Sequence, residues 1–147
     1  MRVLMDTNVL VRATGRSSGP ARELFLQLLD PPHAISASEY LLDELRRVLN
    51  YPRVQRVHGL TPQEAEQHVR DIEAIAEVVD VPGPLPFQVR QDPDDDPIIA
   101  AAVYGRVDVL CTRDRHFRRP EVISYCAQFN IRVLTDLELL AELRASE

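Results

Sequence analysis

Short apolar runs alternate along the chain with longer stretches in which apolar residues recur every three or four positions. The short runs are typical of buried β-strands, and the longer stretches are typical of amphipathic helices. This alternation predicts the α/β class, with helices packed on a central, mainly parallel sheet of about five short strands. The expected strands cover residues 3–5, 33–36, 78–81, 107–112 and 131–134.

Capping boxes predict where three of the helices begin. Ser36-Ala-Ser-Glu39 is expected to start a helix that runs to about Asn50 and is stopped by Pro52. Thr61-Pro-Gln-Glu64 and Thr135-Asp-Leu-Glu138 carry the same signal. The expected helices cover residues 20–29, 37–49, 62–77, 97–105 and 136–145, with a short helix before the last strand.

Length and composition are those of an ordinary globular protein. With 147 residues, the chain is expected to form a single domain that covers residues 1–147. It has no run near the ~20 apolar residues that span a bilayer. Its N-terminus lacks the layout of a signal peptide. We therefore expect a cytoplasmic protein with no membrane partner.

The charged residues narrow the possible functions. The net charge of −6 argues against a surface that binds nucleic acid generally. All 17 basic residues are arginines, which excludes a lysine nucleophile, a Schiff base, a phosphate-loop lysine and a phospho-receiver domain. A dinucleotide-binding fold is excluded as well, because no G-x-G-x-x-G follows the first strand.

Three aspartates are expected at one edge of the sheet. Asp6 directly follows the first strand, and Asp114 follows the strand at 107–112. Asp96 stands at the amino end of the helix 97–105, which should pack beside them. In such sheets, ligands bind outside the carboxyl ends of the strands. Taken alone, Asp96 can also serve as a helix cap and Asp114 as a turn residue.

A fourth acid lies on the helix 37–49. At about 100° per residue, Glu44 falls at the border of the buried stripe, whereas Asp43 points to solvent. Taken alone, Glu44 is also compatible with a solvated helix surface. Acids gathered at one sheet edge repel one another unless a cation lies between them. Mg²⁺ or Mn²⁺, which prefer carboxylate and water oxygens, would relieve this repulsion.

Four segments carry a resemblance to a known family. MDTNVLV, SEYLLDELRRVL, DPDDDPIIAAAVYG and VLCTRDRHF together resemble the PIN-domain ribonucleases, above all the toxin components of toxin–antitoxin pairs. The resemblance covers essentially the whole chain and implies a three-layer α/β/α PIN-like fold. The metal-binding and catalytic residues that it implies are Asp6, Glu44, Asp96 and Asp114. The supporting residues that it implies are Asn8, Asp92, Asp95 and Thr112.

The activity implied by the resemblance is metal-dependent hydrolysis of phosphodiester bonds in single-stranded or structured RNA. Whether one or two metal ions take part stays open. The direct ligand is Asp95 or Asp96, and the D-x-x-I-x-A-A spacing of the family favours Asp96. Basic side chains near the acids are expected to hold the RNA: Arg113, Arg115, His116, Arg118, Arg119, Arg46 and Arg47.

The resemblance also implies protein partners, namely a small antitoxin that covers the pocket and a second copy of the chain in a homodimer. Two other functions stay open. One is a structure-specific DNA nuclease with a similar acidic pocket, although the length of the chain leaves little room for elements that grip duplex DNA. The other is a catalytically silent PIN-like module that binds RNA or protein, against which the presence of all four acids argues.

Overall fold

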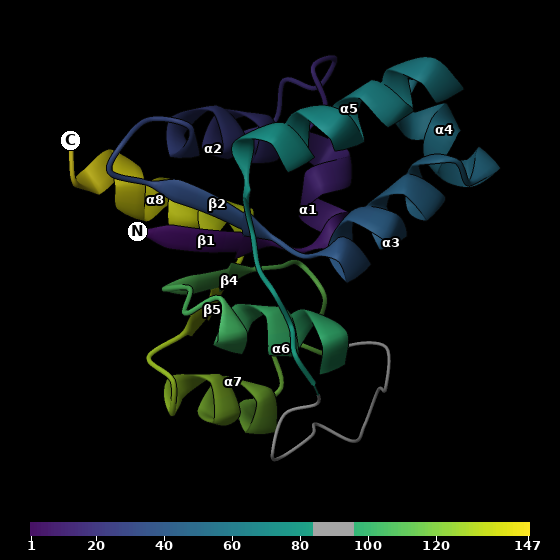
Figure 1. The fold of residues 1–147 in the computed structure, drawn as a ribbon. Helices are drawn as coiled ribbons and strands as arrows, with labels where there is room; N and C mark the ends of the chain where they lie inside the picture. Colours follow the sequence, from purple (N-terminus) through teal and green to yellow (C-terminus); the bar gives the residue numbers. More distant parts are fainter. Residues whose placement is uncertain (84–95) are drawn as a thin grey trace.

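The computed structural model describes residues 1–83 and 96–147, without the side chain of Asp96. Within this part of the chain, five parallel strands form one sheet in the order β3-β2-β1-β4-β5, which confirms the α/β class (Figure 1). The strands are β1 (Arg2–Met5), β2 (Ala34–Ala37), β3 (Glu77–Val78), β4 (Val109–Cys111) and β5 (Arg132–Leu134). The first strand lies in the middle, where Val3 pairs with Val109 of β4.

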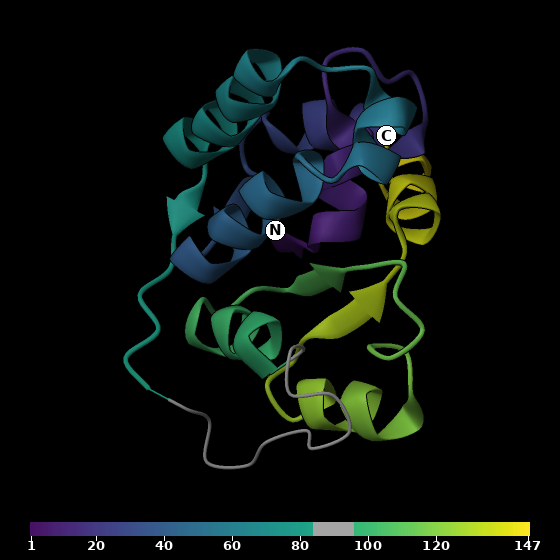
Figure 2. The same ribbon diagram turned by 90° about the vertical axis from the view of Figure 1, so that its right-hand side faces the viewer.

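Helices cover both faces of the sheet and give three layers. Figures 1 and 2 show α6 and α7 on one side and α2 and α8, which pack together, on the other. The helices of the described residues are α1 (Thr7–Leu10), the 3-10 helix η1 (Val11–Ala13), α2 (Pro20–Leu28), α3 (Glu39–Leu49), α4 (Pro52–His58), α5 (Pro62–Ile75), α6 (Asp96–Tyr104), α7 (Pro120–Ala127) and α8 (Asp136–Ala145).

Two of the three predicted capping boxes are present. They lie at Thr61, before α5, and at Thr135, before α8. The box predicted from Ser36 was wrong, because Ser36 is a buried residue of β2. The cap of α3 is Ser38, whose side chain accepts a 3.2 Å hydrogen bond from the N–H of Leu41.

Three further boundaries differ from the sequence-based prediction. Residues 9–11, for which no helix was expected, belong to α1 and η1. Pro52, expected only to stop a helix, is the first residue of α4, where its missing N–H removes no helical hydrogen bond. The strand expected at 78–81 is the two-residue strand β3.

The central strand is buried on both faces. Val3, Leu4 and Met5 are each 0% exposed, as is typical of a parallel sheet covered by two helical layers. The next residue, Asp6, directly follows these apolar side chains and is itself only 4% exposed. The fold therefore places a carboxylate inside the protein at the carboxyl end of its central strand.

The end of α6 approaches the chain beyond β3 closely. A Cβ atom at Gly105 would lie 2.7 Å from Cγ2 of Val79 and 2.8 Å from the carbonyl oxygen of Ala101. The left-handed conformation that follows the helix belongs to Arg106, with φ of 50°. Gly105 is thus required for space and not for its backbone conformation.

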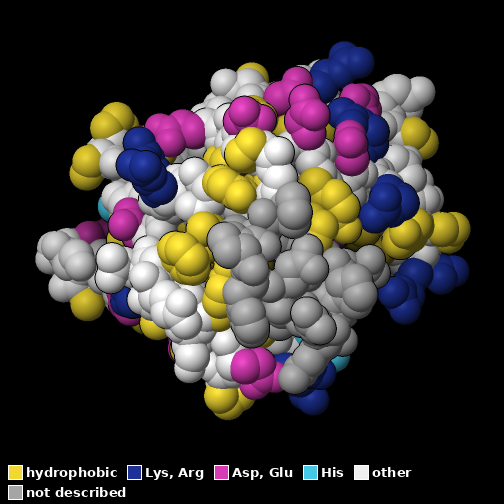
Figure 3. Space-filling view, turned by 60° about the horizontal axis from the view of Figure 1, so that its bottom comes forward, with side chains coloured by type: hydrophobic (Ala, Val, Ile, Leu, Met, Phe, Trp, Pro, Cys, Tyr) yellow, Lys and Arg dark blue, Asp and Glu magenta, His cyan; other side chains and the backbone are white. Residues whose placement is uncertain are grey.

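The surface around the residues drawn in grey in Figure 3 has mixed character. Acidic and basic side chains are interspersed on this face, and hydrophobic side chains lie between them. Within residues 1–83 and 96–147, no helix is both long and apolar enough to cross a membrane.

Candidate active site

Asp6 forms the floor of the candidate site. It caps α1, since its Oδ1 accepts a 2.8 Å hydrogen bond from the N–H of Thr7. Its Oδ2 accepts hydrogen bonds from the hydroxyl of Thr112 at 2.8 Å and from Nδ2 of Asn8 at 3.2 Å. The sequence pairs an extended strand with a short helix here, and the turn between them fixes the carboxylate.

The environment of Asp6 disfavours its charge. Burial raises the pKa of Asp6 from 3.8 to about 6, although hydrogen bonds from Thr112 and Thr7 act to lower it. Repulsion from the carboxylates of Glu44 and Asp114 raises this pKa further. A cation bound beside Asp6 would offset both the burial and the repulsion.

Glu44 faces this carboxylate from α3. Its Oε1 accepts a 2.7 Å hydrogen bond from the hydroxyl of Thr7, and its side chain is half-buried. Asp43, the preceding residue, is exposed and forms an ion pair with Arg46 at 3.1 Å. The helix therefore turns Glu44 toward the site and Asp43 toward solvent.

Asp114 lies in the turn after β4. The hydroxyl of Thr112 accepts a 3.0 Å hydrogen bond from the N–H of Asp114. The Oδ1 of Asp114 in turn accepts a 2.9 Å hydrogen bond from the N–H of His116. Because Thr112 also donates to Asp6, one hydroxyl links the carboxyl ends of β1 and β4.

These three acids line one cleft of about 430 Å³. Ile98 of α6 also lines this cleft. Asp92, Asp95 and the side chain of Asp96 lie outside the described residues. The full lining is Asp6, Thr7, Asn8, Tyr40, Glu44, Arg47, Val48, Ile98, Asp114 and Phe117.

The chemistry of the cleft suits a hard divalent cation. All three acids offer carboxylate oxygens, which Mg²⁺ and Mn²⁺ prefer, and the buried Asp6 gains from a nearby positive charge. Among residues 1–83 and 96–147, no group of three or more His, Cys, Asp or Glu is arranged to hold an ion by itself. An ion here would therefore take further ligands from water or from acids beyond the described part of the chain.

The predicted RNA-binding residues of α3 differ in position. Arg47 lines the cleft beside Glu44. Arg46 points to α5 instead, where its Nε lies 2.7 Å from Oε2 of Glu66. This pair connects two helices, so that Arg46 has a structural partner and Arg47 faces the site.

The basic residues after β4 are spread over a wider surface. Arg115 and His116 are exposed next to Asp114. The guanidinium of Arg118 lies 3.1 Å from Glu138 on α8. Arg119 is half-buried and caps α7.

The prediction missed a fifth acid at this edge of the sheet. Asp136, the first residue of α8, is 1% exposed. Neither of its carboxylate oxygens accepts a hydrogen bond from a described residue, and Nε of Arg113 lies 3.5 Å from its Oδ1. The signal was present in the sequence, because Asp136 follows the strand at 131–134 much as Asp114 follows the strand at 107–112.

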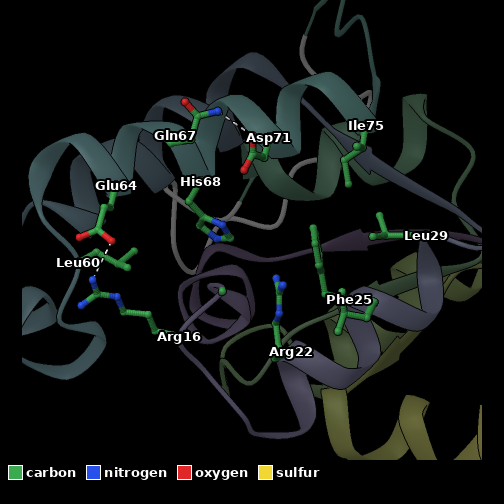
Figure 4. A pocket seen from close by; sticks show the side chains of 12 residues that line it. Arg16, Arg22, Phe25, Leu29, Leu60, Glu64, Gln67, His68, Asp71 and Ile75 are labelled. Atoms are coloured by element: carbon green, nitrogen blue, oxygen red, sulfur yellow. Dashed lines mark hydrogen bonds and ion pairs between the residues drawn. The ribbon is translucent and has the colours of Figure 1, made fainter.

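A separate cavity of about 440 Å³ lies between α2 and α5 (Figure 4). Its wall carries the apolar side chains of Phe25, Leu29 and Ile75, and its rim carries the ion pair between Arg16 and Glu64 at 2.8 Å. None of the predicted site acids lines it. Glu64, His68 and Asp71 of α5 line it as well, opposite the apolar side chains of α2.

Comparisons with known proteins fit this geometry. A family model described as a PIN domain matches residues 2–116. The crystal structure of VapBC2 from Rickettsia felis, bound to a DNA fragment from their promoter, resembles the chain with a TM-score of 0.60 and 16% sequence identity. That match covers 92% of this chain and 98% of the other. At this identity the likeness shows the fold alone. The comparison with curated proteins gave no match.

Proposed function

Because the chain belongs to the PIN-domain family, we propose that it is a metal-dependent endoribonuclease that hydrolyses phosphodiester bonds in RNA, and that it acts as the toxin of a toxin–antitoxin pair. One observation carries the nuclease proposal. Asp6, Glu44 and Asp114, from three separate segments, line one cleft at the carboxyl ends of β1 and β4. Such a gathering of carboxylates is unfavourable unless it binds a cation.

Each acid has a distinct task in this proposal. Asp6 and Asp114 hold Mg²⁺ or Mn²⁺, together with Asp96 at the start of α6. When bound, the ion lowers the pKa of a coordinated water and neutralises charge on the phosphoryl oxygens. Glu44 accepts a hydrogen bond from Thr7 and either joins the ligands or orients the attacking water.

The neighbouring polar side chains keep these acids in place. Thr112 and Asn8 both donate to Oδ2 of Asp6, which holds Oδ1 against the N–H of Thr7. Mutation of residues that orient metal ligands in this way typically lowers metal affinity by about 10–100-fold. Thr112 and Asn8 are therefore positioning residues.

Exposed residues around the cleft supply contacts for the RNA. Arg47 lines the cleft, and Arg115 and His116 extend its rim beyond Asp114. Phe117 is 1% exposed and belongs to the core, whereas Tyr40 lines the cleft and is 37% exposed. Phosphates on the basic groups and a base stacked on Tyr40 suit single-stranded RNA.

The proposed partners rest on the resemblance to toxins and on the fold. A small antitoxin covers the cleft and keeps RNA out, and two copies of the chain form a homodimer. The similarity to VapBC2, which was crystallised with promoter DNA, supports an antitoxin that also binds DNA. The proposed site of action is the cytoplasm.

Cleavage of labelled single-stranded RNA by the purified protein tests the nuclease proposal. The wild type is assayed with Mn²⁺, with Mg²⁺ and with a chelator, beside Asp6→Asn and the matched control Asp43→Asn from the exposed side of α3. We expect metal-dependent cleavage by the wild type and by Asp43→Asn, and a loss of at least about 100-fold in Asp6→Asn.

Parallel assays with single-stranded and branched DNA separate the alternatives. Cleavage of DNA but not of RNA would establish a DNA nuclease instead. Binding of Mn²⁺ and RNA without cleavage of any substrate would establish a silent binding module. Loss of activity in Asp43→Asn equal to that in Asp6→Asn would contradict the assignment of the site.

A further inference from the structure

Another cavity, of about 330 Å³, lies beside η1 and the start of α2. Arg12 of η1, Arg113 after β4 and Asp136 of α8 line it, together with the residues that lead into α2. Arg113 connects the two cavities. Its N–H donates a 3.2 Å hydrogen bond to Oδ1 of Asn8, the same residue whose Nδ2 bonds Asp6.

The carboxylate of Asp136 is an unusual group in this wall. It is 1% exposed, and neither oxygen accepts a hydrogen bond from a described residue. The negative charge of Asp136 is partly offset by Nε of Arg113 at 3.5 Å. It is also offset by the positive end of the α8 dipole, because Asp136 is the first residue of α8. An ion pair between this buried carboxylate and a half-exposed guanidinium is seldom more stabilising than apolar side chains of the same volume. Stability therefore does not explain why an acid stands at this position.

The pair fixes the direction of an otherwise mobile side chain. The Arg113 side chain is 38% exposed, so its guanidinium reaches solvent while Asp136 restrains it from below. An arginine that is already held in one orientation loses less conformational entropy when it binds a phosphate. The turn after β4 thus carries a preorganised cation directly beside the acidic cleft.

The rest of the cavity also favours an anion. Arg12 is exposed and forms no ion pair among the described residues. Gly19, the N-cap of α2, offers no side-chain oxygen to the first-turn N–H groups. Arg16, by contrast, is engaged by the carbonyl of Gly59 at 2.9 Å and by Glu64 at 2.8 Å. A restrained Arg113, an unpaired Arg12 and an uncapped helix end together match a phosphate group.

We propose that Asp136 is a positioning residue that holds Arg113 at the mouth of this cavity, where Arg113 and Arg12 bind a backbone phosphate of the RNA strand beyond the acidic cleft. The inference rests on the proposed function and deepens it, because it names a path for the strand past Asn8. It assigns Asp136 no contact with the RNA and no part in the chemistry.

The test compares Asp136→Asn, Arg113→Gln, Arg12→Gln and the double variant Asp136→Asn/Arg113→Gln with the wild type. The matched control is Arg132→Gln, an exposed arginine paired with Glu142 at the opposite ends of the strands. For each protein we measure kcat and KM for RNA cleavage, the Kd for labelled RNA in chelator at several salt concentrations, and Tm.

We expect KM and Kd to rise at least about fivefold in Arg113→Gln and Asp136→Asn, with kcat within about twofold of the wild type. The salt dependence of Kd should weaken in Arg12→Gln and Arg113→Gln by about 0.7 in slope each. In the double variant, Asp136→Asn should add nothing to Arg113→Gln, because it acts only through that side chain. Arg132→Gln should match the wild type.

The outcomes separate this inference from the proposed function. RNA cleavage with unchanged KM and Kd in Arg113→Gln and Asp136→Asn overturns the inference alone, even if Asp136→Asn lowers Tm. Fully additive effects in the double variant overturn the positioning role. If the wild type binds RNA but does not cleave it, and Arg113→Gln and Asp136→Asn bind RNA more weakly as expected, the inference is upheld and the nuclease proposal is overturned. No RNA binding by the wild type overturns the inference.

Discussion

The hydroxyl of Thr112 donates a 2.8 Å hydrogen bond to Asp6, across 106 positions of sequence. The same oxygen accepts a 3.0 Å hydrogen bond from the N–H of Asp114. One buried side chain, which is 0% exposed, therefore fixes the positions of two acids of the candidate site relative to each other. This link gives the first of four predictions.

Replacing Thr112 by Val keeps the shape of the side chain but removes the donor to Asp6. The pKa of Asp6 should rise further, and its carboxylate should lose its fixed orientation. We expect the affinity for Mn²⁺ to fall by about 10–100-fold, measured by titration calorimetry. Thr112→Ser retains the hydroxyl and is the control. Equal affinities for Thr112→Val and the wild type would show that Thr112 does not orient the site.

The contribution of Asp6 to the stability of the metal-free protein should fall as the pH rises from about 4 through about 6. The pKa of Asp6 is about 6 in the folded state and 3.8 ordinarily, so the folded state binds the proton more tightly in this range. The contribution of Asp6 to stability must then decline through this range and stay level once Asp6 is ionised in both states, above about pH 7. The gap between the two values corresponds to about 3 kcal/mol.

Urea unfolding in chelator at pH 4 to 7 measures this decline. Asp6→Asn, which cannot ionise, should lack the part of the slope that belongs to Asp6. An identical slope in the wild type and in Asp6→Asn would locate the titrating group elsewhere.

Divalent metal should stabilise the fold through the acids of the cleft. At a concentration of 100 times its Kd, Mn²⁺ should add about 2.7 kcal/mol to the free energy of unfolding. For a chain of this size, that raises Tm by about 5–10 °C. Glu44→Gln should reduce the rise, and Asp43→Asn, its exposed neighbour, should leave it unchanged. A thermal melt with and without Mn²⁺ compares them, and equal responses in the two variants would argue against a role for Glu44.

Gly105→Ala should destabilise the protein by about 1–3 kcal/mol. The new Cβ would lie 2.8 Å from the Ala101 carbonyl oxygen, which belongs to the helix backbone and cannot turn away. Gly15→Ala is the control, since a Cβ there meets no atom within 4 Å. Urea unfolding compares the two, and similar midpoints for both variants would mean that α6 can shift to make room.

Most of the sheet could be predicted from the sequence, because its strands are short apolar runs with clear boundaries. The capping boxes at Thr61 and Thr135 were also recognisable, since each depends only on residues three positions apart. The capping box at Ser36 was predicted wrongly because Ser36 and Glu39 have the same spacing as the other boxes, whereas Ser36 is a buried residue of β2. Helix α1 has four residues, too few to show helical periodicity.

The candidate acids could be named for a different reason. Parallel strands end at the same edge, so the position of Asp6 and Asp114 after apolar runs was enough to bring them together. The distances within the site were beyond this reasoning, as was the role of Thr7 between Asp6 and Glu44. Asp136 escaped notice because its capping box explained it as an ordinary helix residue, and only its burial distinguishes it.

The sheet order has a consequence for synthesis of the protein. The ribosome makes β1 first, yet β1 acquires its neighbour β4 only when residue 109 and those after it have left the exit tunnel. Until then Asp6 has neither the hydroxyl of Thr112 nor Asp114 beside it. A growing chain that has not yet reached β4, or one that a premature stop codon ends before β4, contains Asp6 and Glu44 but cannot form the cleft. If the assembled cleft cuts RNA, the messenger that is being translated is spared until residues 109–114 of its own product are in place.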